Sequence, residues 1–484
     1  MSGRPLFAVV GHPNKGKSSI VATLAADDSV RIGPEAGTTT QARRYPMRVD
    51  GQELYALVDT PGFQRARRVL HWLRQHERGA HRRAEVVRQF VASHRDTGEF
   101  PDECELLEPI LEGAGILYVV DGSVPYGPEY EPEMEILRWT GQPSLALVNP
   151  IGPADHLAEW QAALGQFFQV VRVFNAVTAE FRKRIELLRA FGELQEPWRG
   201  VLAQAVRLLE ADRTRTRRLA AHTVAETLAA MLAHRVERKL PARADPTGQK
   251  AALESEFRSD LRRLEQRCRD RVETLYSHRR IERQEAGLPL VDEDLFAERT
   301  WLVFGLGRRQ ILAGGALGGA ATGAWVDAHL GGLRCLRGGA WGRDRGGDGL
   351  VDGGSVGTGA GDGRAAGGRL ITAGPTRNRN FPHVVFNRAR YHHWLVARRT
   401  HAAQSVLAVR GDPRAVLPPL PGEELSTLEK IFDRLRRNPE ATAVQGELAD
   451  RIAAVFARDD DLGDARVDSA AGRRDPPPIA NIGA

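Results

Sequence analysis

The sequence predicts an α/β domain with a mainly parallel sheet, followed by a mostly α-helical C-terminal region. Over about the first 195 residues, short apolar runs alternate with segments of helical spacing, which is typical of a parallel sheet covered by helices. Beyond Trp198, apolar residues recur at three- and four-residue steps over long stretches, which indicates amphipathic helices.

The composition is that of a soluble globular protein. The 484 residues include 42% hydrophobic and 27% charged residues, and the length allows about three domains. The net charge of +6 permits an anionic partner without requiring one. Three widely spaced cysteines exclude a readable disulfide framework or zinc knuckle. The N-terminal apolar run is too short for a signal peptide, so we expect a cytoplasmic protein, with peripheral attachment to the inner membrane as the alternative.

A glycine-bounded loop follows the first predicted strand, Leu6 to Val10, and matches the phosphate-loop pattern G-x-x-x-x-G-K-[ST]. Its glycines let successive N–H groups face a β-phosphate, next to the positive end of the following helix. We expect Lys17 to bridge the β- and γ-phosphates and Ser18 to ligate Mg²⁺. The nucleotide-binding residues predicted in this loop are Gly11, Asn14, Lys15, Gly16, Lys17, Ser18 and Ser19.

A predicted hairpin and a D-x-x-G sequence follow the loop. Residues 44–49 and 53–58 have strand patterns joined at Asp50-Gly51, a short-hairpin signal. The second strand ends on Asp59, where Mg²⁺ needs a second anchor. Gly62, three residues later, allows its own N–H to approach a γ-phosphate closely.

Together with Gly37-Thr38-Thr39, these segments resemble the first three nucleotide motifs of Era/TrmE-type GTPases, a translation-factor-related, 50S ribosome-binding-type branch of the P-loop NTPases. The resemblance implies a G domain that binds GTP and GDP with Mg²⁺. It also implies that Thr39 ligates Mg²⁺ and senses the γ-phosphate, with Thr38 as the alternative. Residues 31–43 would then form switch I, and the segment after Asp59 switch II.

The resemblance further implies that Asn14 recruits K⁺ where other GTPases use an arginine finger; the alternative is a plain loop residue. The catalytic residues predicted in this way are Lys17, Thr39, Gly62 and Asn14. The predicted metal ligands are Ser18, Thr39 and Asp59.

Two sequence features bear on hydrolysis and on base recognition. Phe63 occupies the place of the water-positioning glutamine of Ras-like proteins, so we expect slow hydrolysis that K⁺, a G-domain dimer partner or a bound effector stimulates. Asn149-Pro150-Ile151-Gly152 replaces the family's guanine-recognising N-K-x-D, which leaves guanine against adenine specificity open. Asn149 can still brace the loop, and Asn175-Ala176 loosely resembles the family's base-contacting S-A motif. We therefore count Asn149, Asn175 and Ala176 among the predicted nucleotide-binding residues.

The region after the D-x-x-G sequence is enlarged. Residues 64–97 have a helical pattern and contain nine arginines. One interpretation is a solvated basic face on a packed helix. The other is a switch-coupled surface for an unknown protein, ribosomal or RNA partner.

Changes in composition and in helical pattern divide the chain after the G domain into further parts. The whole layout resembles a group of bacterial proteins with an Era-like G domain before an uncharacterised helical domain. Within the predicted G domain, Asp121 should cap the turn after its strand. In the last part of the chain we expect one final amphipathic helix from about Leu425 to Phe456. After the G domain of residues 1–195, the predicted parts are a helical hairpin (196–300), a Gly/Ala-rich helical segment (301–330), a disordered Gly-rich linker (331–378), C-terminal helices (379–457) and a disordered tail (458–484).

These patterns favour a GTPase switch and leave two alternatives. The first is a nucleotide-binding scaffold with little hydrolysis, which Phe63 and the altered guanine motif favour. The second is a dynamin-like GTPase that associates with a membrane through residues 302–326. Because their charge-free core falls short of the ~20 residues that span a bilayer, a tightly packed soluble helix is the competing interpretation of that segment.

Overall fold

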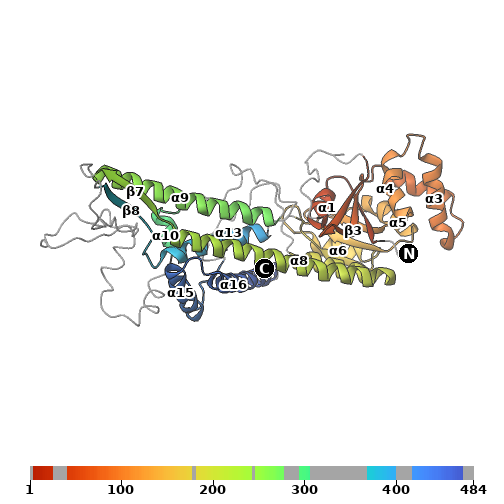
Figure 1. Cartoon of the computed structure of the whole chain (residues 1–484). Helices are drawn as coiled ribbons and strands as arrows, with labels where there is room; N and C mark the ends of the chain where they lie inside the picture. The colour runs from red at the N-terminus through yellow and green to blue at the C-terminus, as the bar shows by residue number, and fades with distance from the viewer. Residues whose placement is uncertain are drawn as a thin grey trace, which may run out of the picture. The chain divides into compact units, whose positions relative to one another are not determined.

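The computed structural model describes residues 4–25, 41–176, 181–241, 246–276, 294–305, 368–398 and 417–471. They form two compact units, unit 1 from Met1 to Thr214 and unit 2 beginning at Arg215 (Figure 1). The division differs from the predicted domain boundary at residue 195, because the start of the following helix packs on the sheet of unit 1.

Unit 1 is built on a six-stranded sheet in the order β2-β3-β1-β4-β5-β6. All neighbouring strands are parallel except β2, which runs antiparallel to β3 through a turn at Asp50 and Gly51. The mainly parallel α/β fold predicted from the sequence is confirmed. The strands are β1 (Leu6–Val10), β2 (Arg43–Val49), β3 (Gln52–Asp59), β4 (Gly115–Val120), β5 (Ser144–Val148) and β6 (Val170–Val173).

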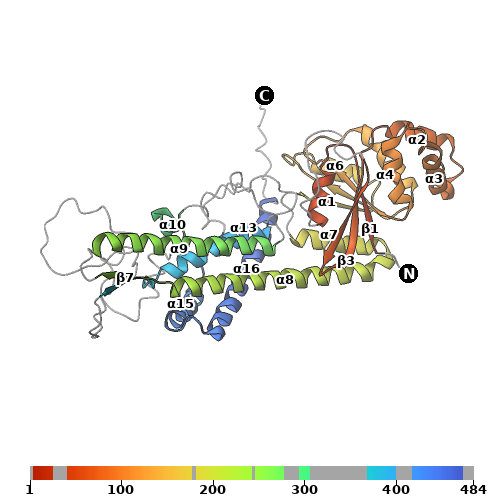
Figure 2. The same ribbon diagram turned by 45° about the horizontal axis from the view of Figure 1, so that its top comes forward.

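Side chains alternate between two buried faces of this sheet, so each face carries its own apolar core. On one face lie α1 (Lys17–Ala25), α7 (Phe181–Leu194) and the first part of α8 (Glu196–Ala233). On the other lie α2 (Ala66–Gln75), α3 (Arg83–His94), α4 (Pro101–Leu111), α5 (Glu131–Trp139) and α6 (Leu157–Leu164) (Figure 2). The short helices η1 (Ala80–Arg82) and η2 (Pro128–Tyr130) precede α3 and α5.

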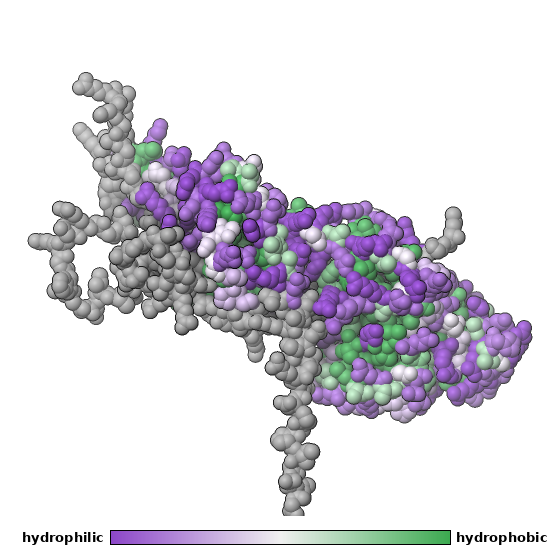
Figure 3. Space-filling model, turned by 90° about the horizontal axis from the view of Figure 1, so that it is seen from below, coloured by the Kyte–Doolittle hydropathy of each residue, from purple (hydrophilic) through white to green (hydrophobic). Residues whose placement is uncertain are grey.

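Unit 2 is a helical bundle with one apolar core and a two-stranded antiparallel ribbon. After α8 its helices are α9 (Pro246–Leu275), α10 (Glu298–Phe304), α13 (Phe381–Arg398), α15 (Gly422–Arg437) and α16 (Thr442–Ala471). Its strands are β7 (Val236–Pro241) and β8 (Gly368–Ala373). Figure 3 shows a largely hydrophilic surface with an area of apolar residues on unit 1.

Three sequence predictions for this half of the chain are wrong in part. Residues 236–241, expected at the end of a helix, form β7, and residues 368–373 of the expected linker form its partner β8. The expected single helix over 425–456 is two helices, because Pro439 lacks an N–H and disfavours helical backbone at Asn438. The expected tail from residue 458 is helical as far as Ala471.

Within the described residues no helix is long and apolar enough to cross a membrane. Residues 306–326 of the predicted Gly/Ala-rich segment, and 331–367 of the predicted linker, lie outside the described residues.

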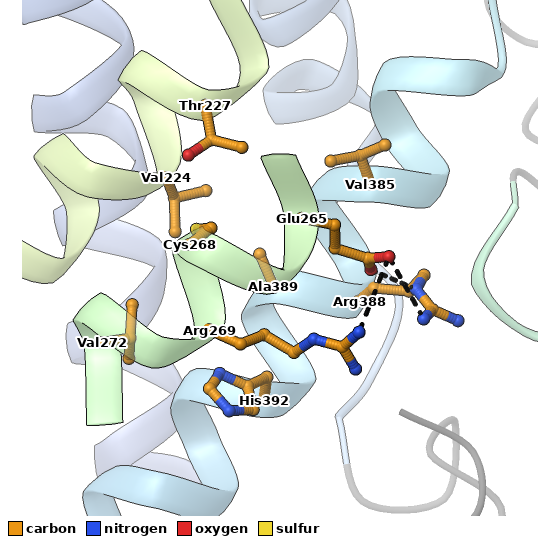
Figure 4. Close-up of a pocket in the computed structure, with 10 residues that line it drawn as sticks. All are labelled: Val224, Thr227, Glu265, Cys268, Arg269, Val272, Val385, Arg388, Ala389 and His392. Atoms are coloured by element: carbon orange, nitrogen blue, oxygen red, sulfur yellow. Dashed lines mark hydrogen bonds and ion pairs between the residues drawn. The ribbon is translucent and has the colours of Figure 1, made fainter. Parts of the chain in front are cut away.

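Buried ion pairs join helices of unit 2 that are distant in sequence. Arg388 of α13, 1% exposed, donates through Nε to Oε1 of Glu265 in α9 at 2.6 Å. Arg269 of α9 lies 3.9 Å from the other oxygen of Glu265. These groups line a cavity of about 20 Å³ between α8, α9 and α13, room for about one water molecule (Figure 4). Arg390 of α13 makes a second buried pair with Asp459 of α16, at 2.6 Å.

We predict that removing one partner of the Arg388–Glu265 pair destabilises the protein. Glu265→Ala should lower the free energy of unfolding by about 3–5 kcal/mol, because it leaves a guanidinium buried without its carboxylate. Glu256→Ala, on the same helix, is the matched control, since the Arg238–Glu256 pair is largely exposed and should contribute about 0–1 kcal/mol. Chemical denaturation measures both variants; equal losses would contradict the prediction.

His383 of α13 generates a prediction of pH dependence. Burial, with help from the charge of Arg436, lowers the pKa of this imidazole to about 4, and Glu429 lies 3.9 Å away. Because the unfolded chain takes up the proton at higher pH, the free energy of unfolding should fall as the pH drops from about 6.5 to 4, by up to roughly 3 kcal/mol. In His383→Leu, denaturation at pH 7 and pH 5 should show a smaller difference than in the wild type; an unchanged difference would refute this assignment.

Candidate functional site

The loop between β1 and α1 is held in a shape that requires glycine at two positions. Gly11 has φ +141°, and a Cβ there would lie 2.4 Å from the carbonyl oxygen of Val119. Gly16 has φ +83°, and a Cβ there would lie 2.2 Å from Nδ2 of Asn149. Asn14, between them, is exposed and also has positive φ, at 60°. The loop therefore has the tight curl that a phosphate loop needs.

Lys17 lies at the start of α1, where the loop turns into the helix. Its Nζ donates a hydrogen bond to the carbonyl oxygen of His12 at 3.1 Å. Burial lowers the pKa of Lys17, while the nearby carboxylates of Asp59 and Glu133 raise it. Burial has the larger effect, so the pKa of Lys17 is lowered overall, and an additional anion beside the ammonium would stabilise its charge.

The two predicted metal ligands of this region that the structure describes lie together. Ser18 donates through Oγ to Oδ2 of Asp59 at 2.8 Å, and Asp59 is 3% exposed at the end of β3. A hydroxyl and a carboxylate in contact, beside a loop for phosphate oxygens, are a donor set that fits Mg²⁺. Ser19, the next residue of α1, is half-buried. Gly37, Thr38 and Thr39 lie outside the described residues.

Gly62 packs directly against the phosphate loop. A Cβ at this position would lie 2.7 Å from the backbone nitrogen of Pro13, so only glycine fits. Two residues earlier, Thr60 donates through Oγ1 to the carbonyl oxygen of Val9 at 2.8 Å. The D-x-x-G segment is therefore tied to the strand that carries the loop.

Asn149 braces the opposite side of the loop, as the sequence predicts for this residue. Its Nδ2 donates to the carbonyl oxygen of Lys15 at 3.3 Å, and its Oδ1 accepts from the N–H of Ala176 at 3.1 Å. Asn175 donates through Nδ2 to the carbonyl oxygen of Pro150 at 2.9 Å. Asn149, Asn175 and Ala176, predicted from the sequence as nucleotide-binding residues, thus meet at one edge of the loop.

Two further side chains complete this edge. Asp121 caps the turn after β4, as predicted, by accepting hydrogen bonds from the N–H and hydroxyl of Ser123 at 2.9 and 2.6 Å. Ile151 is 58% exposed and lies 3.6 Å from the position of a Cβ on Gly16. An apolar side chain, at the third position of the segment compared above with N-K-x-D, therefore borders the loop.

A buried carboxylate that no sequence pattern indicates lies behind the loop. Glu133 of α5, 1% exposed, contacts Nδ1 of His12 at 2.8 Å through one oxygen. Its other oxygen accepts from the hydroxyl of Tyr118 at 2.9 Å; burial and this carboxylate raise the pKa of Tyr118. His12 and Glu133 are 121 residues apart, and no spacing in the sequence connects them.

Comparison with protein families gives two matches. The model described as domain of unknown function DUF3482 matches residues 161–458. The model described as 50S ribosome-binding GTPase matches residues 6–149, which hold the loop, the D-x-x-G segment and Asn149.

Curated relatives match over short stretches. GTPase Der of Mycoplasma pneumoniae is 46% identical over 59 residues, 12% of this chain and 13% of that protein. GTPase Der of Hyphomonas neptunium is 32% identical over 123 residues, 25% of this chain and 24% of that protein. The chain thus spans a quarter or less of the length of these relatives.

Two solved structures of Era are similar at low identity. One is Era in complex with MgGDPNP and nucleotides 1506–1542 of 16S ribosomal RNA, with 17% identity, 56% of this chain and 89% of that chain covered, and a TM-score of 0.28. The other is an Aquifex aeolicus Era variant bound to GDP and AlF4⁻, with 19% identity, the same coverage and a TM-score of 0.27.

The position of Lys17 generates a binding prediction. Lys17→Ala should weaken the binding of a nucleoside triphosphate by roughly 10- to 100-fold, because a hydrogen bond to a charged group contributes about 1.5–3 kcal/mol. Lys183→Ala removes a lysine whose exposed side chain pairs with Glu186, and it should leave the affinity unchanged. Titration with a fluorescent nucleotide measures both variants, and an unaltered affinity in Lys17→Ala would rule out this site.

Proposed function

The chain belongs to the DUF3482 family, with a P-loop GTPase domain ahead of the DUF3482 region, and from this premise we propose a Mg²⁺-dependent molecular switch that hydrolyses GTP to GDP and phosphate. One observation carries the proposal. Ser18 Oγ lies 2.8 Å from Asp59 Oδ2, next to Lys17 and a loop in which only glycine fits at two positions. The residues that we propose as phosphate and metal ligands thus come from separate segments and lie close together.

We assign the residues of this site the following parts. Ser18 and Asp59 would hold Mg²⁺, with Thr39 of switch I as a further ligand. When bound, Mg²⁺ neutralises charge that develops on the phosphate oxygens. Lys17, whose ammonium lies on the His12 carbonyl, is in place to exchange that partner for phosphate oxygens. The loop amides, the N-terminus of α1 and the Gly62 N–H stabilise the transition state electrostatically, while water attacks in line.

We propose that unaided hydrolysis is slow. Phe63, in the place of a water-positioning glutamine, is 1% exposed and packs in the core shared with α2 and α4. A buried phenyl ring neither reaches nor orients an attacking water. Asn14 has an exposed side chain on the phosphate loop and would recruit K⁺, alone or with a G-domain dimer partner. The burial of Phe63 equally supports the second candidate, a nucleotide-binding scaffold with little hydrolysis.

The partner of the switch would be anionic. The apolar residues of α2 face the core, while Arg67, His71 and Arg74, at three- and four-residue steps, lie on its exposed face. A stripe with two exposed arginines in the enlarged region after Gly62 suits a phosphate-rich partner such as ribosomal RNA, or an acidic protein. Membrane attachment through residues 302–326 and a cytoplasmic location stay predictions.

The test measures binding and turnover of fluorescent GDP, GTP and ATP by the full chain with Mg²⁺, in K⁺ and in Na⁺ buffer. We expect tighter binding of the guanine nucleotides, and a loss of triphosphate binding when Mg²⁺ is chelated. Tight binding with no turnover in K⁺ would favour the scaffold. Equal binding of ATP would mean that Gly152, in the place of the guanine-recognising aspartate, has removed base selection.

Asn14 generates a separate prediction. K⁺ should accelerate GTP hydrolysis by roughly tenfold over Na⁺, which corresponds to about 1.4 kcal/mol of transition-state stabilisation. Asn14→Gly keeps the positive φ without strain and should lose this acceleration while GDP affinity is retained. Steady-state phosphate release measures the effect; K⁺ stimulation that persists in Asn14→Gly would exclude this role.

A further inference from the structure

Glu103 of α4 carries a buried carboxylate with an unusual set of partners. The residue is 1% exposed, and no ion pair to it is found in the part of the chain that the structure describes. Its Oε1 instead accepts hydrogen bonds from the backbone N–H groups of Gln64 and Arg65, at 2.9 and 2.5 Å. Burial of a carboxylate is costly unless such hydrogen bonds compensate it.

These two N–H groups stand at the start of α2, which begins at Ala66. The first N–H groups of a helix have no partner within the helix, and its N-terminus carries partial positive charge. Glu103 supplies both the acceptor and the negative charge, so it determines where the chain after Gly62 turns into α2.

The same segment is held on both sides of Gly62. On the far side Phe63 is buried with residues of α2 and α4, and Arg65 and Arg68 contact the backbone and side chain of Glu99, just before α4. On the near side the Thr60 hydroxyl is bonded to Val9. Gly62 is thus the short stretch between two anchored ends, and its N–H is the group expected to contact a γ-phosphate.

Helix α4 also contacts the end of the other predicted switch. Oε1 of Glu105 accepts from the N–H of Ala42 at 2.8 Å, and Ala42 lies within the predicted switch I, residues 31–43. Two carboxylates on one helix, two residues apart, therefore bond to the backbone of both switches.

We propose that Glu103 is a positioning residue for GTP hydrolysis: it fixes the backbone after Gly62 so that the Gly62 N–H faces the γ-phosphate, and α4 links the two switches. Glu103 touches no nucleotide and acts through Gly62. The inference rests on the proposed function, because it assigns the enlarged switch II region a part in the same reaction.

The test uses Glu103→Ala and Glu103→Gln in the full chain. Glu108→Ala is the matched control, because Glu108 lies on the same helix and pairs with Arg95 at the surface. We measure the affinity for GDP and for a non-hydrolysable GTP analogue, together with kcat and KM. Glu103→Ala should leave the affinity for GDP close to that of the wild type but weaken the binding of the GTP analogue. It should also lower kcat by about 10- to 100-fold, which is the equivalent of one lost charge-assisted hydrogen bond. Glu103→Gln, which keeps the shape and one acceptor oxygen, should fall between the wild type and Glu103→Ala.

A merely structural role would give a different result. If the Glu103 variants lose GDP and analogue affinity equally, or keep the wild-type kcat, the inference is overturned while the GTPase assignment stands. If the wild type itself binds neither nucleotide, the proposed function fails and the inference with it. Retained GDP affinity in Glu103→Gln shows that this variant is folded, so a selective loss of the analogue there supports the positioning role.

Discussion

The register between β1 and β3 is the constraint on which the site depends. These parallel strands pair Val9 with Asp59, so the strand that leads into the phosphate loop ends beside the strand that leads into the D-x-x-G segment. Carboxyl ends of parallel strands meet at one edge of a sheet, and this brings Asp59 within 2.8 Å of Ser18. A slip of one residue would turn every side chain of the strand to the other face. The apolar cores on both faces therefore also fix the positions of the residues that we propose as metal and phosphate ligands.

The segment that we propose as switch II is held by contacts that its helical sequence pattern does not reveal. Phe63 is part of the core, Glu103 caps α2, and the helices α3 and α4 extend that core beyond a minimal G domain. Because this segment is already ordered, it should lose little conformational entropy when a γ-phosphate binds. Phe63 is buried in this core and cannot orient a water, which is why we look to a cation or a partner for stimulation.

Unit 2 contains two buried ion pairs inside its apolar helical bundle. Arg388 and Arg390 of α13 pair with Glu265 of α9 and Asp459 of α16, all buried. Such pairs add little net stability but penalise any alternative packing that leaves one charge alone. We infer that they set the register of α13 against its neighbours, and that the helical region is a defined structure with its own core.

The G domain could be predicted from the sequence, because its signals are local. The loop glycines, Lys17, Ser18 and the Asp59–Gly62 segment lie within a few residues of strand and helix patterns that place them, and Asn149 was correctly expected to brace the loop. The contacts between distant segments could not be predicted in this way: Glu133 contacts His12, Glu103 accepts from Gln64 and Arg65, and β7 pairs with β8 across more than a hundred residues. A buried glutamate looks like a solvated one in a helical pattern, and a short strand such as β7 is stabilised by its partner strand more than by its own residues. The hydrogen-bond partners of the buried glutamates can be identified only in the folded structure, where each polar group lies beside its partner.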